Sequence, residues 1–505
     1  MDLSRTYDRA KARLNDLLLS EGLRAKALFG GAWLGGASVA EQAVRFARNM
    51  VLARLLAPSA FGTMAIVLSS SSLVDTLTDV GVRGAIVQNP RGGEEGYLNA
   101  AWWLGIGRAL GTYILIFALA PWIAGFYGHP ELSSLLRVAL LSILLNAAMS
   151  PRSILPQREM KFGRWVAISN GGGMCGVILT VVLSFFIRDV WALAFGYLGE
   201  NAFRCLFSYI VCPGLPSLKW DWHASKDLLT FTRGIFGLSF LSLIIGRADV
   251  FVLGRLYSST ALGLYTMAVA LIMTPLSFLT NLLGQILFPA LARVQQDTHR
   301  LNRIVLELTS WFMLLGLPAL VSICLFAPRL LKLVYGARYA AAAGPLSVAC
   351  AVVFITVLNC PFTTALFAKG RPGLHRVAMI ISAIVIVSAI YPACKYLGTS
   401  GGQVAALLAV LAGYLFQLTR MHTLTGLNLR SYGKLFVQPV LASGGIVAIV
   451  LFARQLGLAT RPAADVAICV GACLLAYAIC GAPFIRTLRA REPQRVSLPE
   501  SLVSQ

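Results

Sequence analysis

Apolar runs of about 20 residues recur along almost the whole chain, and this repetition constrains the fold more than any other feature. A helix of that length crosses the hydrocarbon core of a bilayer. Only 13% of the 505 residues are charged and 57% are hydrophobic, whereas soluble domains carry about 25% charged residues. One soluble core cannot bury so much apolar surface. The sequence therefore predicts an all-α, polytopic membrane protein.

The apolar runs divide the chain into about fourteen transmembrane helices. The first six are expected at 30–56, 63–88, 99–124, 132–150, 166–187 and 190–212. The next six are expected at 231–255, 263–292, 306–327, 343–368, 374–392 and 403–420, and a final pair at 433–453 and 464–485.

Basic residues predict the orientation of these helices. With the N-terminus in the cytoplasm, 27 of the 43 Lys and Arg fall in cytoplasmic segments and 8 on the opposite side. Cytoplasmic loops carry such an excess in membrane proteins. The bias alternates loop by loop, so it supports an even number of helices with both termini in the cytoplasm. It also accounts for most of the net charge of +22, which excludes the nucleic-acid partner that a basic soluble domain would indicate.

A repeat with an offset of 201 residues divides the helices into two halves. Val51–Leu55 reappears as Val252–Leu256, and Ala60-Phe61-Gly62 reappears as Ala261-Leu262-Gly263. The offset spans six helices, an even number, so the two halves point the same way. Parallel repeats of this kind place a substrate path between the halves.

The resulting domain plan has six parts. It comprises an amphipathic cytoplasmic segment (1–29), an N-terminal six-helix bundle (30–212), a cytoplasmic linker (213–230), a C-terminal six-helix bundle (231–420), a terminal helix pair (421–485) and a cytoplasmic tail (486–505).

Catalytic signatures are missing from the sequence. It contains neither a Gly-x-x-x-x-Gly-Lys-Ser/Thr phosphate loop nor a Gly-x-Ser-x-Gly nucleophile elbow. The cysteines lie mostly in apolar runs and the histidines have no ligand spacing, so we expect no metal and no cofactor. The predicted loops are too short for a catalytic domain. These features predict a secondary transporter and not an enzyme.

Charged residues inside predicted membrane helices are the candidate substrate ligands, because burying a charge in a bilayer is costly. Arg45 and Arg48 share one face of the first helix, and Arg247 lies at a similar depth in the seventh. Arg108 and Arg204 are weaker candidates, nearer the cytoplasmic entrance. An arginine fork donates two parallel hydrogen bonds to phosphate oxygens, so this set predicts a site for a diphosphate.

Acidic residues at similar depth are candidates for binding a coupling H⁺ or Na⁺. They are Glu41, Asp75, Asp79 and Asp249. The alternative is permanent pairing that locks helices together, such as Arg45 with Asp75, Arg247 with Asp249 or Glu200 with Arg204.

Several short motifs, in order along the chain, resemble a known family. They are Leu52–Pro58 with Phe61-Gly62, Asp79–Gln88, Pro151-Arg152, Gln157–Glu159, Arg247–Asp249, Leu253–Arg255, Leu262–Tyr265, Phe288–Arg293 and Gly370–Pro372. Together they are similar to the polysaccharide-transport, Wzx-like flippases of the multidrug/oligosaccharidyl-lipid/polysaccharide exporter superfamily. One departure is Ser59-Ala60, where the family usually has an acidic residue before Phe-Gly.

The resemblance implies alternating access between two bundles in a bacterial inner membrane. It implies an undecaprenyl-diphosphate-linked oligosaccharide as substrate, for lipopolysaccharide or exopolysaccharide synthesis, and an ion gradient or membrane potential as driving force. The expected partners are membrane lipids, a polysaccharide polymerase and a chain-length regulator. A lipid II-type flippase and a drug or cation exporter of the same superfamily remain alternatives, although an exporter of cations predicts an acidic cavity.

Overall fold

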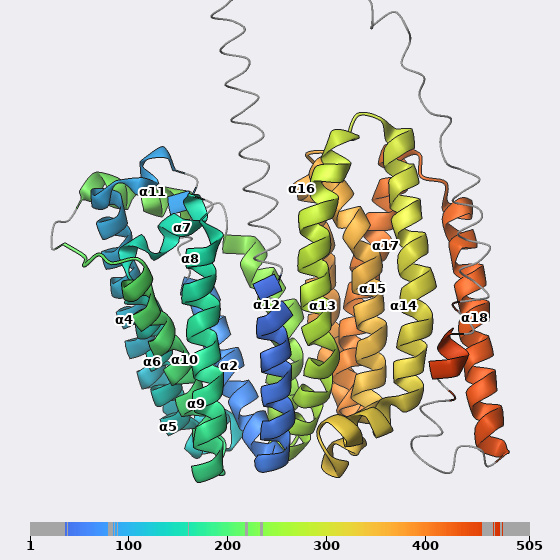
Figure 1. The fold of residues 1–505 in the computed structure, drawn as a ribbon, viewed down its shortest axis with the longest axis horizontal. Coiled ribbons are helices and arrows are strands. Elements are labelled where there is room, and N and C mark those ends of the chain that lie inside the picture. The colour runs from blue at the N-terminus through green and yellow to red at the C-terminus, as the bar shows by residue number, and fades with distance from the viewer. Residues whose placement is uncertain are drawn as a thin grey trace, which may run out of the picture.

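The computed structural model is a bundle of long helices (Figure 1). It describes residues 36–37, 39–78, 84, 86–87, 89–159, 161–217, 221–232, 236–456, 468, 470–474 and 477. No strand occurs among these residues, in agreement with the predicted all-α class. Nine of the described helices are long and apolar enough to cross a membrane, or ten if the bent pair Glu131–Ala147 and Pro151–Arg158 is one span.

The N-terminal half begins with a helix over 39–55. Its other helices are α2 (Pro58–Thr78), α4 (Glu95–Tyr127), α5 (Glu131–Ala139), α6 (Leu141–Ala147), α7 (Leu155–Arg158), α8 (Phe162–Val166), α9 (Gly172–Phe186) and α10 (Val190–Val211). Short turns are the 3₁₀ segments η1 (Pro90–Gly93) and η2 (Pro151–Ile154) and a π-helical turn, η3 (Ala167–Gly171).

The C-terminal half contains the longest helices. They are α12 (Phe236–Leu256), α13 (Ser259–Arg293), α14 (Thr298–Val334), α15 (Ala343–Ala368), α16 (Pro372–Leu397), α17 (Ser400–Thr425) and α18 (Leu429–Gln455), with the 3₁₀ turn η4 (Ala337–Ala342) before α15. At 1.5 Å per residue, the 37 residues of α14 span about 55 Å. This helix is therefore longer than the 306–327 predicted, because it continues beyond the thickness of the hydrocarbon core.

The predicted and observed helices differ in two other places. The linker 213–230 was predicted without structure, but it contains most of α11 (Trp222–Thr232). Ala224 and Leu228, one turn apart, are buried against Tyr97 and Leu98 of α4, so tertiary packing stabilises this short helix.

The predicted helix 132–150 is divided into α5 and α6. The last predicted helix, 464–485, lies mostly outside the described residues, as do 1–29 and 486–505.

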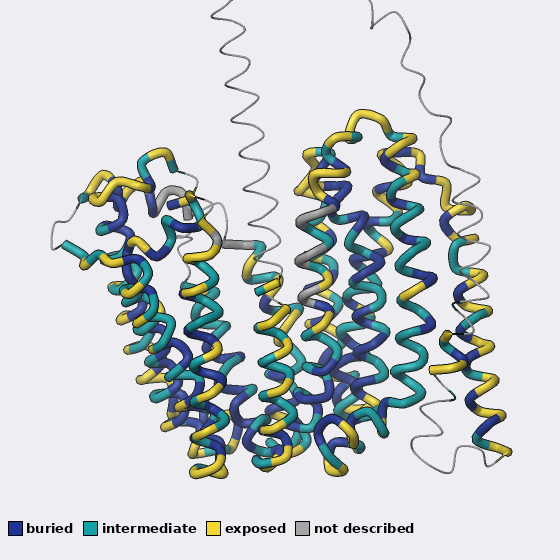
Figure 2. The backbone as a smooth tube through the Cα atoms, viewed as in Figure 1, coloured by how far each residue is buried: buried dark blue, intermediate teal, exposed yellow. Residues whose placement is uncertain are grey.

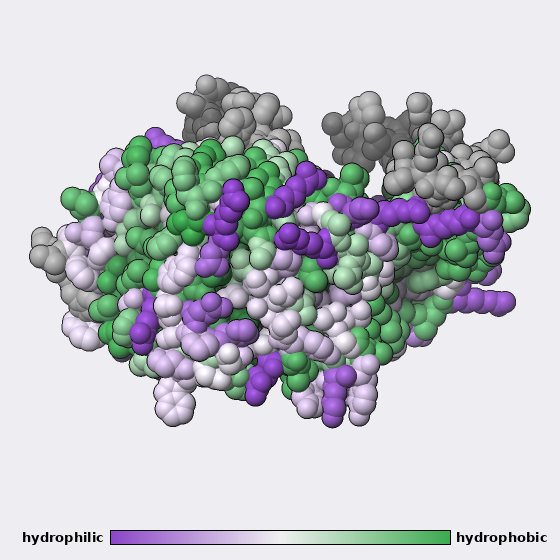
Figure 3. Space-filling view, turned by 90° about the horizontal axis from the view of Figure 1, so that it is seen from below, coloured by the Kyte–Doolittle hydropathy of each residue, from purple (hydrophilic) through white to green (hydrophobic). Residues whose placement is uncertain are grey.

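Lipid-facing and packed surfaces alternate around the helices (Figure 2). Large apolar side chains stay exposed on the outer faces, for example Ile178 (62%), Val387 (60%) and Leu441 (71%). Such exposure suits a bilayer, where apolar side chains meet lipid tails. The end face on which α2 and α13 begin presents hydrophilic side chains among apolar ones, as a surface in contact with water does (Figure 3).

The two halves meet where α2 and α13 begin, and they diverge toward the other end (Figure 1). Two glycines permit this contact. A Cβ at Gly62 would lie 1.9 Å from the Ser259 carbonyl oxygen, and a Cβ at Gly263 would lie 1.7 Å from the Pro58 carbonyl oxygen. Both pairs are related by the 201-residue offset. The sequence repeat thus corresponds to a reciprocal contact, in which the same position of each half approaches the backbone of the other.

Candidate functional site

A cavity of about 490 Å³ lies between the two halves. Its wall comes from the first helix, α2, α9 and α10 on one side, and from α12 and α13 on the other. Four arginines line it: Arg45, Arg48, Arg204 and Arg247. The structure thus brings together four of the five arginines predicted as substrate ligands. Among the charged residues that line the cavity, Glu200 is the one carboxylate.

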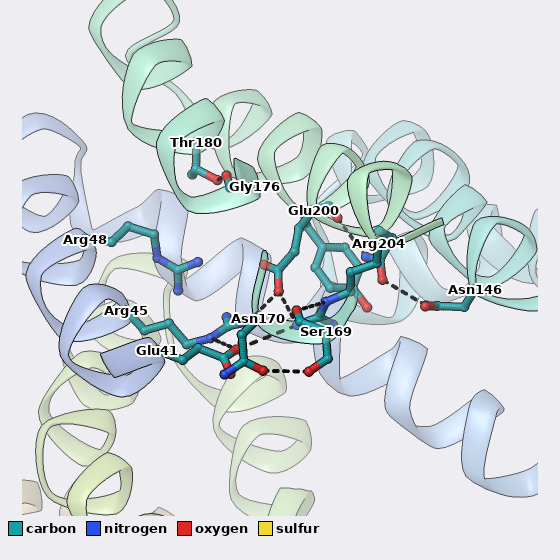
Figure 4. Close-up of polar contacts among 12 residues, drawn as sticks. Glu41, Arg45, Arg48, Asn146, Ser169, Asn170, Gly176, Thr180, Glu200 and Arg204 are labelled. Carbon is teal, nitrogen blue, oxygen red and sulfur yellow. Dashed lines mark hydrogen bonds and ion pairs between the residues drawn. The ribbon is translucent and has the colours of Figure 1, made fainter. Parts of the chain in front are cut away.

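Two of these arginines belong to a network of ion pairs (Figure 4). Arg45 Nη2 lies 2.5 Å from Glu200 Oε1 and 3.0 Å from Glu41 Oε1. Arg204 Nη2 lies 2.9 Å from Glu200 Oε1 and 3.8 Å from Glu41 Oε1. The predicted pairing of Glu200 with Arg204 is therefore present, whereas Arg45 contacts two glutamates in place of Asp75. Two carboxylates balance two guanidinium groups, and the network is neutral.

Glycines of α9 position this network. A Cβ at Gly176 would lie 2.4 Å from Glu200 Cβ, and a Cβ at Gly172 would lie 2.7 Å from Arg204 Cα. The Gly-x-x-x-Gly spacing of these two residues allows close helix packing in membranes. The preceding π-helical turn leaves the Ser169 carbonyl oxygen as acceptor for Arg204 Nε at 3.2 Å. Glu200 was predicted only as a partner of Arg204, and this glycine spacing is the signal that could have placed it in the site.

Arg48 and Arg247 differ from the paired arginines. Arg48 donates to the uncharged Asn49 Oδ1, at 3.2 and 3.3 Å. Neither Arg48 nor Arg247 forms an ion pair with any carboxylate in the described part of the chain. In Figure 4 the Arg48 guanidinium is directed toward the network without being joined to it. These two arginines, from opposite halves, supply the net positive charge of the cavity.

Two other predicted residues lie away from the cavity. Arg108 contacts Thr78 Oγ1 at 3.0 Å and Asp75 Oδ1 at 3.9 Å, beside a separate cavity of about 270 Å³. Arg108 and Asp75 therefore form a local pair within the N-terminal half. Asp79 lies outside the described residues.

Asp249 belongs to a different group of residues. Its carboxylate accepts hydrogen bonds from the Tyr265 hydroxyl at 2.5 Å and from the Val250 amide at 2.8 Å. Gln403 Nε2 donates to the same Tyr265 oxygen at 2.7 Å. Asp249 thus accepts hydrogen bonds from neutral groups of α12 and α13, and Gln403 of α17 contacts it only through Tyr265. The predicted alternative, an Arg247–Asp249 ion pair, does not form.

The cavity has the chemistry of an anion site. Two guanidinium groups without carboxylate partners face a space of about 490 Å³ from both halves. Guanidinium groups bind phosphate oxygens through bidentate, charge-assisted hydrogen bonds. An organic cation would meet excess positive charge there, so the drug or cation exporter predicted as an alternative does not fit this cavity.

A family model and a curated relative match this chain. The model of a family described as "Polysaccharide biosynthesis protein" matches residues 51–344. The chain is 26% identical over 398 residues to the lipopolysaccharide biosynthesis protein WzxC of Escherichia coli (strain K12), and the match covers 78% of each chain.

Solved structures share the fold. The lipid II flippase MurJ in an inward closed conformation has a TM-score of 0.72 at 13% identity, covering 90% of this chain and 98% of that chain. An inward-facing multidrug resistance MATE family transporter of the MOP superfamily has a TM-score of 0.57 at 17% identity, covering 76% and 96%. At these identities the likeness concerns the fold alone, and it agrees with the superfamily that the sequence motifs resemble.

Proposed function

Because the chain belongs to the family of polysaccharide biosynthesis proteins, we propose that it moves a lipid-linked oligosaccharide across a bacterial inner membrane. The substrate is an undecaprenyl diphosphate that carries a short oligosaccharide, for surface or exopolysaccharide synthesis. The protein acts as a secondary transporter by alternating access, with no covalent step. The two bundles, 30–212 and 231–420, are the moving parts, and membrane lipids, a polymerase and a chain-length regulator are the partners.

One observation carries this proposal: Arg48 and Arg247 face one cavity from opposite halves, and neither has a carboxylate partner among the residues that the structure describes. A diphosphate between them neutralises both charges and connects the halves. The paired Arg45 and Arg204 hold the first helix and α10 in place around the site. Binding energy from the diphosphate is then available to draw the halves together, since a ligand shifts an equilibrium by its differential affinity for the two states.

Access follows from the arrangement of the halves. The glycine contact closes the end where α2 and α13 begin, which the basic-residue bias assigns to the periplasm. The diphosphate head group enters from the cytoplasmic side, while the polyprenyl tail remains in the bilayer. Rocking of the halves about the cavity then exposes the head group to the periplasm.

Deleting the gene tests the substrate class. We expect complete lipid-linked oligosaccharides to accumulate on the cytoplasmic face of the inner membrane, measured by their protection from periplasmic enzymes in intact spheroplasts. Accumulated lipid II in place of oligosaccharide would support the lipid II alternative. Normal surface polysaccharide combined with altered dye resistance would contradict the proposal.

Replacing the two unpaired arginines tests the site. Each of Arg48→Gln and Arg247→Gln removes charge-assisted hydrogen bonds of about 1.5–3 kcal/mol, so we expect undecaprenyl diphosphate to bind about 10- to 150-fold more weakly. The matched control is Arg188→Gln, at an exposed position in the turn between α9 and α10, and it should bind normally. Unchanged binding by both variants at normal protein levels would exclude this cavity as the diphosphate site.

A further inference from the structure

A second cavity, of about 500 Å³, lies in the C-terminal half among α13, α15 and α16. The proposed function makes no use of it. Its lining contains hydroxyl, amide and aromatic side chains and no Lys, Arg, Asp or Glu. The residues used below are Thr280, Thr356, Asn359, Thr363, Thr364 and Phe367 with His375. We refer to it as the threonine pocket.

The threonine hydroxyls present acceptors to this pocket. Thr280, Thr356 and Thr364 each donate their hydrogen to the carbonyl oxygen four residues earlier, at 2.8–3.0 Å. Thr363 donates to Gln417 Oε1 at 3.0 Å. A hydroxyl has one hydrogen to donate and two lone pairs to accept with. With their hydrogens committed to the protein, Thr356, Thr363 and Thr364 can offer a ligand only acceptor capacity.

Asn359 strengthens the same pattern. Its Oδ1 atom is buried and accepts no hydrogen bond from the described residues, although the residue lines the pocket. Leaving a buried acceptor without a donor costs about 1–3 kcal/mol. A ligand hydroxyl group removes this cost once the Asn359 side chain turns its Oδ1 atom toward the pocket.

The pocket selects among ligand classes. The lining contains no Lys or Arg to balance a phosphate or carboxylate, so anions are disfavoured. A bare metal cation needs oxygen ligands on several sides at about 2.0–2.6 Å, and a cavity of about 500 Å³ is too large for that. A neutral ligand rich in hydroxyl donors fits best. The rings of Phe367 and His375, 5.2 Å apart, add an apolar surface of the kind that the C–H face of a sugar ring covers.

Helix α13 connects this pocket with the arginine-lined cavity. Thr266 and Ala270 line the arginine cavity, whereas Gly284 and Phe288 line the threonine pocket. Gly284 follows Thr266 by 18 residues, and Phe288 follows Ala270 by 18 residues. Eighteen residues make five turns of 3.6 residues, so both cavities face the same side of α13. The separation along the helix is about 27 Å. An extended ligand can therefore contact both along one helix.

We propose that the threonine pocket binds the sugars of the lipid-linked substrate, with its acceptors receiving hydrogen bonds from the sugar hydroxyl groups. This inference rests on the proposed function. Recognition has two chemically opposite parts. A cationic, donor-rich cavity holds the diphosphate, and a neutral, acceptor-rich pocket holds the glycan. The second part distinguishes the finished oligosaccharide from a bare lipid diphosphate.

Competition between two probes tests the proposal. The purified full-length protein is mixed with equal amounts of undecaprenyl diphosphate and of the lipid-linked oligosaccharide extracted from the deletion strain, and the bound ratio is measured by native mass spectrometry. The wild type should prefer the oligosaccharide. Each of Asn359→Leu and Thr364→Val removes a hydrogen bond of about 0.5–1.5 kcal/mol, so the preference should fall about 2- to 12-fold. Binding of bare undecaprenyl diphosphate should stay unchanged.

Control variants separate this inference from the proposed function. Thr419→Val makes the same change at an exposed position of α17 and should keep the preference. Arg48→Gln should weaken both probes equally. If both pocket variants kept the wild-type preference, or bound both probes more weakly to the same extent, the assignment of this pocket to the glycan would be overturned. The proposed function would not be affected by that result. If the wild type bound neither probe, the proposed function would fail and the assignment with it.

Discussion

At the scale of single residues, the charges inside the membrane divide into those with a partner and those without. Glu41, Arg45, Glu200 and Arg204 neutralise one another. Removing one member of such a group leaves a buried charge uncompensated, which is strongly destabilising. Arg48 and Arg247 are available to a ligand in the described structure. The surroundings of a charged residue therefore indicate whether it can bind a ligand, whereas its presence in a membrane helix does not.

Asp249 is the acidic residue whose surroundings suit a coupling proton. Glu41 and Asp75 contact arginines at 3.0 and 3.9 Å. Asp249 has neutral hydrogen-bond donors, and Arg247 on the same helix influences it electrostatically without forming an ion pair. A protonated carboxyl could bond Tyr265 with either group as donor, so this position tolerates both charge states.

We expect Asp249→Asn to uncouple transport from the proton gradient, because an amide cannot take up a proton at ordinary pH. The measurement is oligosaccharide translocation into inside-out vesicles with and without an imposed pH difference. Wild-type transport should respond to the gradient and the variant should not. Glu131→Gln, at an exposed position at the start of α5, is the control. A full response in Asp249→Asn would exclude this residue as the proton carrier.

At the scale of helices, glycines decide where backbones approach. Gly172 and Gly176 bring α9 against the part of α10 that carries Glu200 and Arg204. Gly62 and Gly263 bring α2 against α13 at the closed end. The first pair shapes the site within one half, whereas the second pair joins the two halves. Only the second contact has to break when the transporter changes state.

We therefore expect Gly263→Ala to favour opening of this end, because its Cβ would lie 1.7 Å from the Pro58 carbonyl oxygen. Overpacking costs about 1–3 kcal/mol, which corresponds to a shift of about 5- to 150-fold in the population of states. A cysteine at Met267, which lines the arginine cavity, should then react faster with a membrane-impermeant maleimide added from the periplasm. Gly111→Ala, with no atom within 4 Å of its added Cβ, should leave the rate unchanged. An unchanged rate in Gly263→Ala would show that this contact is not the closing gate.

At the scale of the whole molecule, the charge pattern of the loops predicts the topology in the membrane. The basic-residue bias predicts that both termini lie in the cytoplasm, which requires an even number of spans. We expect alkaline phosphatase fused after Gln505 to be inactive and a fluorescent protein at the same position to be bright. Phosphatase inserted at Arg188, in a predicted periplasmic turn, should be active. An active phosphatase at the C-terminus would indicate an odd number of spans.

The class of fold and the position of most helices could be predicted from the sequence, because hydrophobic runs of membrane length have few other solutions. The sequence also contained the repeat, the family motifs and the set of buried charges. It did not reveal α11, whose stability comes from contacts with α4, or the full length of α14. Helix ends depend on what each end packs against.

The pairing of the buried charges could not be predicted from the sequence, because it depends on how the helices pack. Arg45 and Arg204 share two glutamates, and Arg108 lies near Asp75. Arg48 and Arg247 line the same cavity as Arg45 and Arg204 but form no ion pair with a described carboxylate. Helical spacing places residues on a face, but it does not say which face of another helix lies opposite. That choice depends on the close approach permitted by glycines such as Gly176 and Gly263. The sequence shows which charges lie within membrane helices, whereas packing determines which of them form ion pairs with one another.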